Sequence, residues 1–295
     1  MRKIGSDLRE NLYEKVEEII SRENEIDRGF TTLSQLADAK RAVLEDDLLR
    51  EQFKENVTLM NLQHLDKNVY LLNWIAEKEN YLNQRESITS VPSAQTHLSL
   101  LAVYENENSA MVQNNLAFYK KLGEDILAQK YETQYSRYVF ENPDEIKQRM
   151  VNIGKKWVEL KKLSADKKKW LEEVLALEME KEKCRLEFAH LASEFLRSTK
   201  DVMENLAIEH FGFSPQEVEK YKSTLDQNTL NISTLFIKLK GDYEGVWAKL
   251  QQLGITENTY TTTTPGDLEK ALAEMNTSLD ARNNTYKIEL ERHRN

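Results

Sequence analysis

The residues best suited to chemistry in this sequence are Glu187 and His190, a Glu-x-x-His pair on one face of an expected helix. Di-iron helical bundles use such a pair, but they need a second copy and further glutamates, and the sequence has no second copy. Cys184 falls at an apolar heptad position, which favours a small buried hydrophobe over a nucleophile. The Gly-Lys-Lys run at 154–156 lacks the upstream glycine of a phosphate-binding loop. The sequence therefore predicts no catalytic, cofactor or metal site, and it points to a protein that is not an enzyme.

A run of lysines is the strongest charge feature. Between Pro143 and Trp170 the chain has 9 basic and 4 acidic residues, a local charge of 9 − 4 = +5. This run is a solvated helix face, a contact for an acidic partner such as a second copy lying antiparallel, or a contact for anionic lipid. The candidate contact residues are Lys161, Lys162, Lys167, Lys168 and Lys169.

Glycine and proline are scarce. The chain has 9 Gly and 4 Pro, so 13 of its 295 residues, about 4%, are of the two types that break helices. In an average protein glycine and proline together make up about 12% of the residues. Sandwiches, barrels and doubly wound α/β folds need frequent turns, many of them made by glycine, and are disfavoured. The composition predicts an all-α protein with long helices.

The overall charge is acidic, at −9, which argues against nonspecific nucleic-acid binding. A single cysteine cannot form an internal disulfide, as expected in a reducing compartment. The first ten residues do not resemble a secretory signal, and no apolar run is long enough to span a membrane. We expect a cytoplasmic protein.

Three of the prolines share one local pattern, in which a capping side chain, proline and a nearby acid precede the first apolar residue. The cap oxygen satisfies a free backbone N–H, proline is tolerated at the first helical position, and the acid faces the positive end of the helix dipole. The three predicted helix starts are Asn142-Pro143, Ser214-Pro215 and Thr264-Pro265.

Residues 143 to about 210 contain one glycine and no further proline, so they are expected to form one helix of ~100 Å. Apolar residues follow a 4, 3 spacing to Val174 and a 3, 4 spacing after it, which turns the apolar face by about one residue. A helix with this change can serve two successive three-helix bundles. The expected core residues include Trp74, Trp157, Leu171, Val174, Phe188, Phe195, Leu235 and Leu279.

The helix pattern recurs after 265 − 143 = 122 residues, a period typical of a helical solenoid. The threonine-rich stretch at 258–265 resembles a loop and helix start in the alpha-actinin rod, which is built of spectrin repeats. Leu71-Leu72-Asn73-Trp74-Ile75 resembles the opening helix of the first repeat of that rod. The resemblance covers about 59–293. The usual rod has four repeats and this chain shows two, so the resemblance implies a shortened rod.

We therefore expect an elongated rod of tandem spectrin-like three-helix bundles, with repeats at 59–174 and 175–295 joined by a continuous helix. Residues 1–58 are either a neck or two helices of a partial repeat. A break at Gly29 and a capped helix start at 31–36 favour the partial repeat.

The resemblance implies a structural spacer and dimerisation rod of an actin-filament cross-linking protein of the cytoskeleton. It further implies an antiparallel homodimer, with F-actin bound by a head domain outside this chain and EF-hand modules that bind calcium in the parent protein. Two alternatives remain: a spectrin-repeat scaffold with partners other than actin, and a membrane-associated helical dimer.

Overall fold

The computed structural model describes residues 2–207 and 210–294, so Met1 and Asn295, the outer ends of the expected segments, lie outside it. The protein is all-α, with one small β-hairpin among the described residues. Its residues divide into two compact units, the first comprising 1–85 and 101–167 and the second 86–100 and 168–295.

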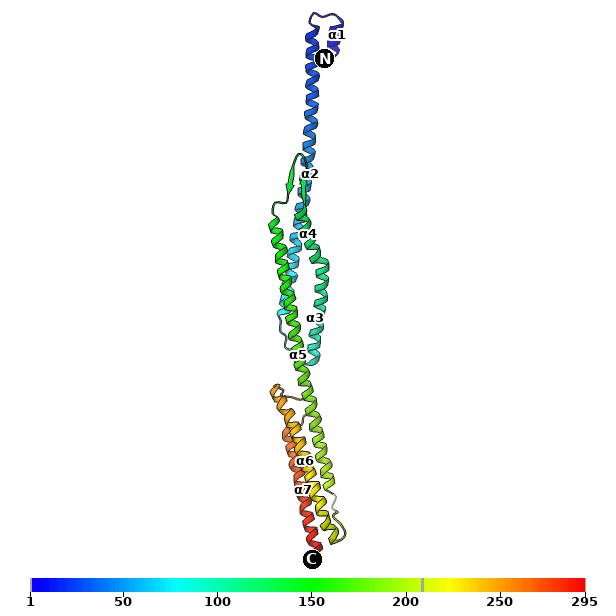
Figure 1. The fold of residues 1–295 in the computed structure, drawn as a ribbon, viewed down its shortest axis with the longest axis vertical. Coiled ribbons are helices and arrows are strands. Elements are labelled where there is room, and N and C mark those ends of the chain that lie inside the picture. Colours follow the sequence, from blue (N-terminus) through cyan, green and yellow to red (C-terminus); the bar gives the residue numbers. More distant parts are fainter. Residues whose placement is uncertain (1, 208–209, 295) are drawn as a thin grey trace. The chain divides into compact units, whose positions relative to one another are not determined.

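The first unit is built around one very long helix (Figure 1). Helix α2 has 68 residues and packs against α4 and the first part of α5. A π-helical turn, η1, connects α3 to α4 without a break in the chain's helical course. The elements are α1 (Arg2–Glu10), α2 (Val16–Asn83), α3 (Val91–Met111), η1 (Val112–Leu116), α4 (Ala117–Ala128), β1 (Lys130–Glu132), β2 (Arg137–Val139) and α5 (Pro143–Leu206).

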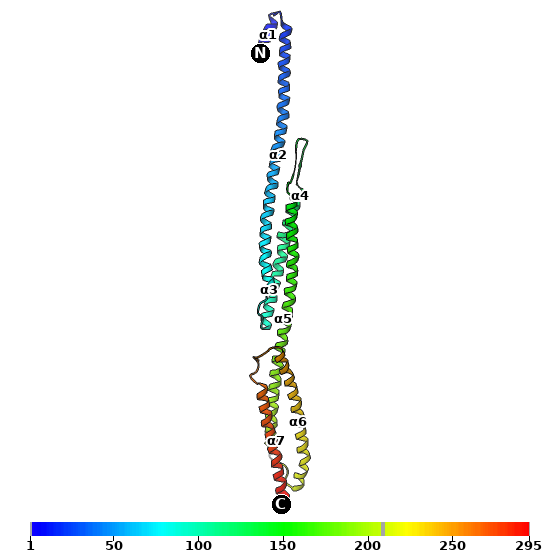
Figure 2. The same cartoon turned by 90° about the vertical axis from the view of Figure 1, so that its left-hand side faces the viewer.

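The second unit is a three-helix bundle. It contains the C-terminal part of α5, α6 (Pro215–Gln252) and α7 (Pro265–Arg294), and both views show α6 and α7 lying side by side (Figures 1 and 2). Helix α5 is unbroken from Pro143 to Leu206 and contributes residues to both units. The prediction of one continuous helix through this stretch is therefore confirmed.

The three long helices after the hairpin begin where the proline pattern predicts, at Pro143, Pro215 and Pro265. Two of these starts show side-chain caps. The Ser214 Oγ accepts a hydrogen bond of 3.4 Å from the Glu217 backbone N–H. The Thr264 Oγ1 accepts one of 3.3 Å from the Asp267 N–H, and the Asp267 Oδ2 accepts one of 2.8 Å from the Thr264 N–H. These bonds satisfy N–H groups that the helix itself leaves free.

The hairpin was not predicted. Strands β1 and β2 pair antiparallel, with Tyr131 opposite Tyr138. Phe53 of α2 lies against both tyrosine rings, at centroid distances of 5.6 and 6.2 Å. Aromatic residues favour strands. A two-stranded hairpin is only marginally stable by itself, and the packing of these two tyrosine rings on α2 supplies the additional contacts that it needs.

The predicted break at Gly29 is wrong, because α2 continues through it. The predicted helix start at 31–36 is wrong for the same reason: the Thr31 hydroxyl donates to the Asp27 carbonyl within the helix, at 2.8 Å. An isolated glycine costs a helix about 1 kcal/mol relative to alanine and does not force it to end.

Apolar side chains form the cores of both units. In the first, Val57, Ile126 and Ile146 are buried together between α2, α4 and α5. In the second, Phe188 and Phe195 of α5 pack with residues of α6 and α7. Leu171 and Leu279 are also buried, and Val174 is half-buried.

The predicted core position of Leu235 is wrong. Its side chain is 43% exposed, whereas the neighbouring Phe236 is 3% exposed and meets the Phe195 ring at 5.2 Å. A strict seven-residue pattern drifts by about 20° per heptad on a straight helix. Over the length of α6 this drift moves the buried face by one residue, and the larger aromatic side chain takes the inner place.

Candidate functional site

Two tryptophans form the aromatic centre of the first unit. Trp74 of α2 and Trp157 of α5 stack with ring centroids 5.3 Å apart and planes only 8° apart. Trp157 is 9% exposed, and the ring of Tyr104 lies 6.4 Å from that of half-buried Trp74. Such stacked pairs contribute about 0.5–1.5 kcal/mol beyond the burial of their surface. Trp74 and Trp157 are therefore packing residues, and their contact holds α2 and α5 in a fixed register.

Lys167, expected on the surface as a partner contact, is completely buried, and this part of the prediction is wrong. Its Nζ donates to the backbone oxygens of Tyr81, at 3.1 Å, and Gln84, at 3.0 Å, and lies 4.6 Å from the centre of the Tyr81 ring. These carbonyls lie at the C-terminal end of α2, which carries the negative end of the helix dipole. The lysine therefore caps a helix from a different part of the chain.

The other four candidate lysines are exposed, as a solvated face or a contact surface requires. Lys161 and Lys162 belong to the first unit, and Lys168 and Lys169 to the second. Lys169 lies 3.9 Å from Glu173 across one helical turn. Exposed ion pairs of this kind stabilise a helix by only about 0.3–0.5 kcal/mol.

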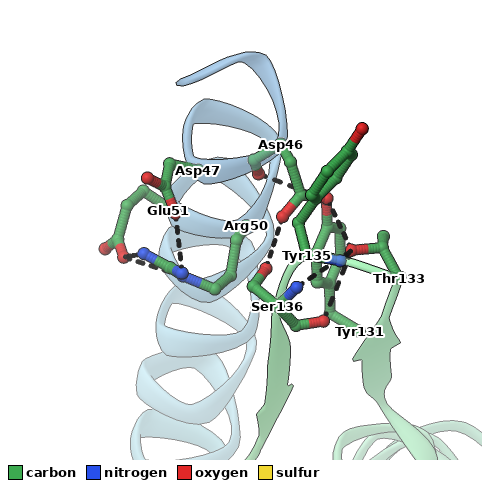
Figure 3. A network of polar contacts seen from close by, with 8 residues as sticks. All are labelled: Asp46, Asp47, Arg50, Glu51, Tyr131, Thr133, Tyr135 and Ser136. Atoms are coloured by element: carbon green, nitrogen blue, oxygen red, sulfur yellow. Dashed lines mark hydrogen bonds and ion pairs between the residues drawn. The ribbon is translucent and has the colours of Figure 1, made fainter. Parts of the chain in front are cut away.

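A polar cluster fastens the hairpin to α2 (Figure 3). Asp46 is 7% exposed, and its carboxylate accepts hydrogen bonds from the hydroxyls of Tyr131 (2.9 Å), Thr133 (2.7 Å) and Ser136 (2.5 Å). Residues 131–136 are thus bound to one side chain more than 80 positions earlier in the sequence. We call Asp46 and these three hydroxyl residues the hairpin clasp.

The clasp favours the charged form of Asp46. The hydrogen bond from the Ser136 hydroxyl is the largest cause of the lowered pKa of Asp46, and the bonds from the Thr133 and Tyr131 hydroxyls lower it further. Desolvation by burial acts in the opposite direction and raises this pKa, but it does not cancel the effect of the hydroxyls. Next to the clasp, Arg50 is held by Asp47 at 2.8 Å and by Glu51 at 3.1 Å. Each of the three hydroxyls donates to the Asp46 carboxylate, so the geometry is that of a structural fastening.

A second polar group lies inside the first bundle. His64 is fully buried and stacks on Tyr119 at a centroid distance of 4.2 Å, and the Tyr119 hydroxyl donates to the Asn68 side-chain oxygen at 3.0 Å. Neither ring nitrogen of His64 has a hydrogen-bond partner among the described residues. Burial lowers the pKa of His64 to about 4, and the nearby Arg149 charge adds to this shift. The histidine is therefore neutral at physiological pH.

The residues first considered for chemistry are not assembled into a site. Cys184 is 5% exposed within the core of the second unit, and His190 is largely exposed beside Glu194, at 3.9 Å. Among residues 2–207 and 210–294, no group of three or more His, Cys, Asp or Glu side chains is arranged to hold a metal ion. No helix of this described part is long and apolar enough to cross a membrane.

Residues 62–173 match the family model of the spectrin repeat. The match supports a spectrin-repeat protein and covers the segment that contains the Trp74–Trp157 stack, the buried Lys167 and most of the first bundle. Spectrin repeats are structural modules and not enzymes, which supports a scaffold role. No curated protein matched the chain.

Sequence reasoning missed the residues that fasten elements distant in the chain. Asp46, His64 and Asn68 all lie on α2 at positions that helix periodicity assigns to its inner face, but their polar character hid them from a search for apolar residues. The signal that could have revealed them is a polar residue at a position where the helical spacing expects an apolar one, because a polar side chain buried there needs a hydrogen-bond partner.

Proposed function

We propose that this chain is a structural spacer and dimerisation rod of an actin-filament cross-linking protein resembling alpha-actinin. The observation that carries the proposal is α5, which runs unbroken from Pro143 to Leu206 and supplies core residues to both units. A shared helix resists bending, because bending requires opening packed apolar faces worth ~25 cal/mol per Å². In this proposal the repeats occupy 59–174 and 175–295.

The remaining parts of the proposal follow the resemblance. An actin-binding head and EF-hand modules would lie outside this chain, two copies would pair antiparallel, and the assembly would belong to the cytoskeleton. The exposed lysines Lys161, Lys162, Lys168 and Lys169 would contact an acidic partner. The spectrin-repeat match at 62–173 supports the scaffold role.

The spacer role is tested by small-angle X-ray scattering of the full chain and of a Lys169→Pro variant. Lys169 is exposed in the middle of α5, so proline there removes a helix hydrogen bond and kinks the helix, while the side chain that is lost faces solvent. A spacer should have a maximum dimension above ~100 Å, set by continuous helices at ~1.5 Å per residue, and the variant should show a bent or broadened distance distribution. A Lys147→Ala control, near the start of α5, should match the parent. A maximum dimension below ~80 Å would refute the spacer role.

A further inference from the structure

A cleft of about 480 Å³ interrupts the apolar core of the second unit. Val202 and Ile232, which pack against the cluster that contains Phe195, line the cleft. Leu225, a member of a separate cluster that contains Phe211, lines it as well. Protein interiors are close-packed, with few voids larger than a water molecule. An opening of this size is instead within the range of small-molecule sites, about 300–1,000 Å³.

The three helices of the second unit line the cleft with one shared pattern. Each helix contributes an apolar residue and, three positions later, a polar residue that continues its heptad series. A single polar residue at an inner heptad position can fix the register of a coiled coil. Three such residues around an open cleft are more than register requires, and they supply the polar groups of a binding site. The pairs are Val202 and Asn205 on α5, Leu225 and Asn228 on α6, and Leu279 and Arg282 on α7.

Arg282 is held in place by contacts in several directions. Its Nη1 donates to the Leu206 backbone oxygen at 2.8 Å, and its Nη2 donates to the Tyr221 hydroxyl oxygen at 3.0 Å. The guanidinium carbon lies 5.2 Å from the centre of the Phe211 ring. These contacts fix a permanent positive charge at the cleft, and none of the described residues that line the cleft is Asp or Glu. One fixed positive charge matches a carboxylate better than a phosphate, which carries nearly two negative charges.

Asn205 and Asn228 supply hydrogen-bonding groups at the same cleft. Both are exposed, and within the described part of the chain neither side chain bonds to another residue. Each amide has two N–H donors and an acceptor oxygen. The occupant that fits such a lining has an apolar body and one anionic head. The apolar wall is formed by aliphatic side chains, those of Val202, Leu206, Leu225, Ile232 and Leu279.

We propose that this cleft binds a small amphipathic carboxylate, with its apolar body against the aliphatic wall and its carboxylate toward Arg282. A molecule in this position fills the gap between the two apolar clusters and stabilises the second unit. The site goes beyond the proposed spacer role, and it lies outside the segment that matches the spectrin repeat, at 62–173.

The first test measures binding of octanoate to the full chain by isothermal titration calorimetry and by the shift in Tm. Two matched probes, 1-octanol and octylammonium, keep the hydrocarbon chain and replace the carboxylate by a neutral or a cationic group. Acetate keeps the carboxylate without the chain. We expect one octanoate per protein, with a Kd of about 1 mM or below, and at least about tenfold weaker binding of each other probe.

Two results of this first test overturn the proposal. One is the absence of both heat and a Tm shift with octanoate up to ~10 mM, which is well above the expected Kd. The other is equal binding of octanoate and 1-octanol, because the carboxylate would then contribute nothing. Neither result bears on the spacer role, which depends on α5.

A pair of variants tests the position of the site. Asn228→Phe places a large side chain in the cleft and leaves Arg282 intact, so it should weaken octanoate binding at least about tenfold. Asn276→Phe makes the same exchange at an exposed residue of α7 that does not line the cleft, and it should bind like the parent. Circular dichroism checks that both variants are folded. Parent-like binding by Asn228→Phe, or an equal loss in both variants, overturns this site.

A second pair tests the charge. Arg282→Gln removes the positive charge, and Arg282→Lys keeps it. The glutamine variant should lose the preference for octanoate over 1-octanol, whereas the lysine variant should retain it. A full preference in Arg282→Gln overturns the role of this charge. Because Arg282 also bonds to Leu206 and Tyr221, the glutamine variant can fail to fold, and Asn228→Phe with the octanol comparison then decides.

Discussion

The Nζ atom of Lys167 in α5 donates a 3.1 Å hydrogen bond to the backbone oxygen of Tyr81, near the C-terminal end of α2. The two residues are 86 positions apart, and the lysine is completely buried. A second bond of 3.0 Å reaches the Gln84 oxygen. The lysine thus supplies donors to the last carbonyls of α2, for which the helix offers no N–H partner.

Replacing this lysine should destabilise the protein. Lys167→Met keeps most of the aliphatic stem and removes the ammonium, so the Tyr81 and Gln84 oxygens lose their bonds inside the structure. We expect a loss of about 1–3 kcal/mol in the free energy of unfolding, measured by urea denaturation. Lys168→Met, at an exposed neighbour, should change it by less than about 0.5 kcal/mol. Equal effects of the two changes would mean that Lys167 is not a buried cap.

The position of the buried face of α6 can be tested with adjacent residues. Phe236→Ala removes a ring that is 3% exposed, and we expect it to cost about 3–5 kcal/mol by thermal or urea unfolding. Leu235→Ala, at a side chain that is 43% exposed, should cost less than about 1 kcal/mol. If Leu235→Ala cost more than Phe236→Ala, the buried face of α6 would include Leu235, as the regular heptad pattern predicts.

Stability should depend on pH through His64. Its pKa is about 4 in the folded protein and about 6.5 unfolded, so the unfolded chain binds more protons between these values. The contribution of His64 is fully present above pH 6.5 and is lost as the pH falls to about 4, by an amount of up to ~3 kcal/mol.

A His64→Phe variant isolates this effect. Phenylalanine keeps a ring against Tyr119 and cannot titrate. The difference in unfolding free energy between the variant and the parent should therefore grow as the pH falls from 6.5 to 4 and stay constant above 6.5. A difference independent of pH would show that His64 is already solvated in the folded state.

The hairpin clasp should control the local opening of β1 and β2. Asp46→Asn removes the carboxylate that accepts from Tyr131, Thr133 and Ser136. We expect faster amide hydrogen exchange across 130–139, measured by mass spectrometry, with little change in α6 and α7. Asp47→Asn, one residue away and bound to Arg50, should leave the hairpin unchanged.

Acid should weaken the hairpin clasp. Because the folded pKa of Asp46 is lowered, its contribution is present above the unfolded value of 3.8 and is lost as the pH falls through the folded value. Hairpin exchange in the parent should approach that of Asp46→Asn only in this acidic range. Convergence at neutral pH would contradict the lowered pKa.

The sequence by itself determined the helical class and the helix starts. Scarce glycine and proline left few places for the chain to turn, and the capping residues at Ser214 and Thr264 act within one helical turn. The unbroken course of α5 was likewise predictable, because apolar spacing and the absence of proline are local properties. Each of these features depends on residues at most a few positions apart.

Tertiary structure decided the burial of Lys167, the exposure of Leu235 and the pairing of Asp46 with the hairpin. A periodic pattern gives the face of a helix only to within about one residue, and the drift accumulates over a long helix. Whether a lysine at the edge of that face is buried depends on which carbonyl groups another helix places beside it. Those partners are more than 80 residues distant, so the spacing of residues along one helix does not specify them.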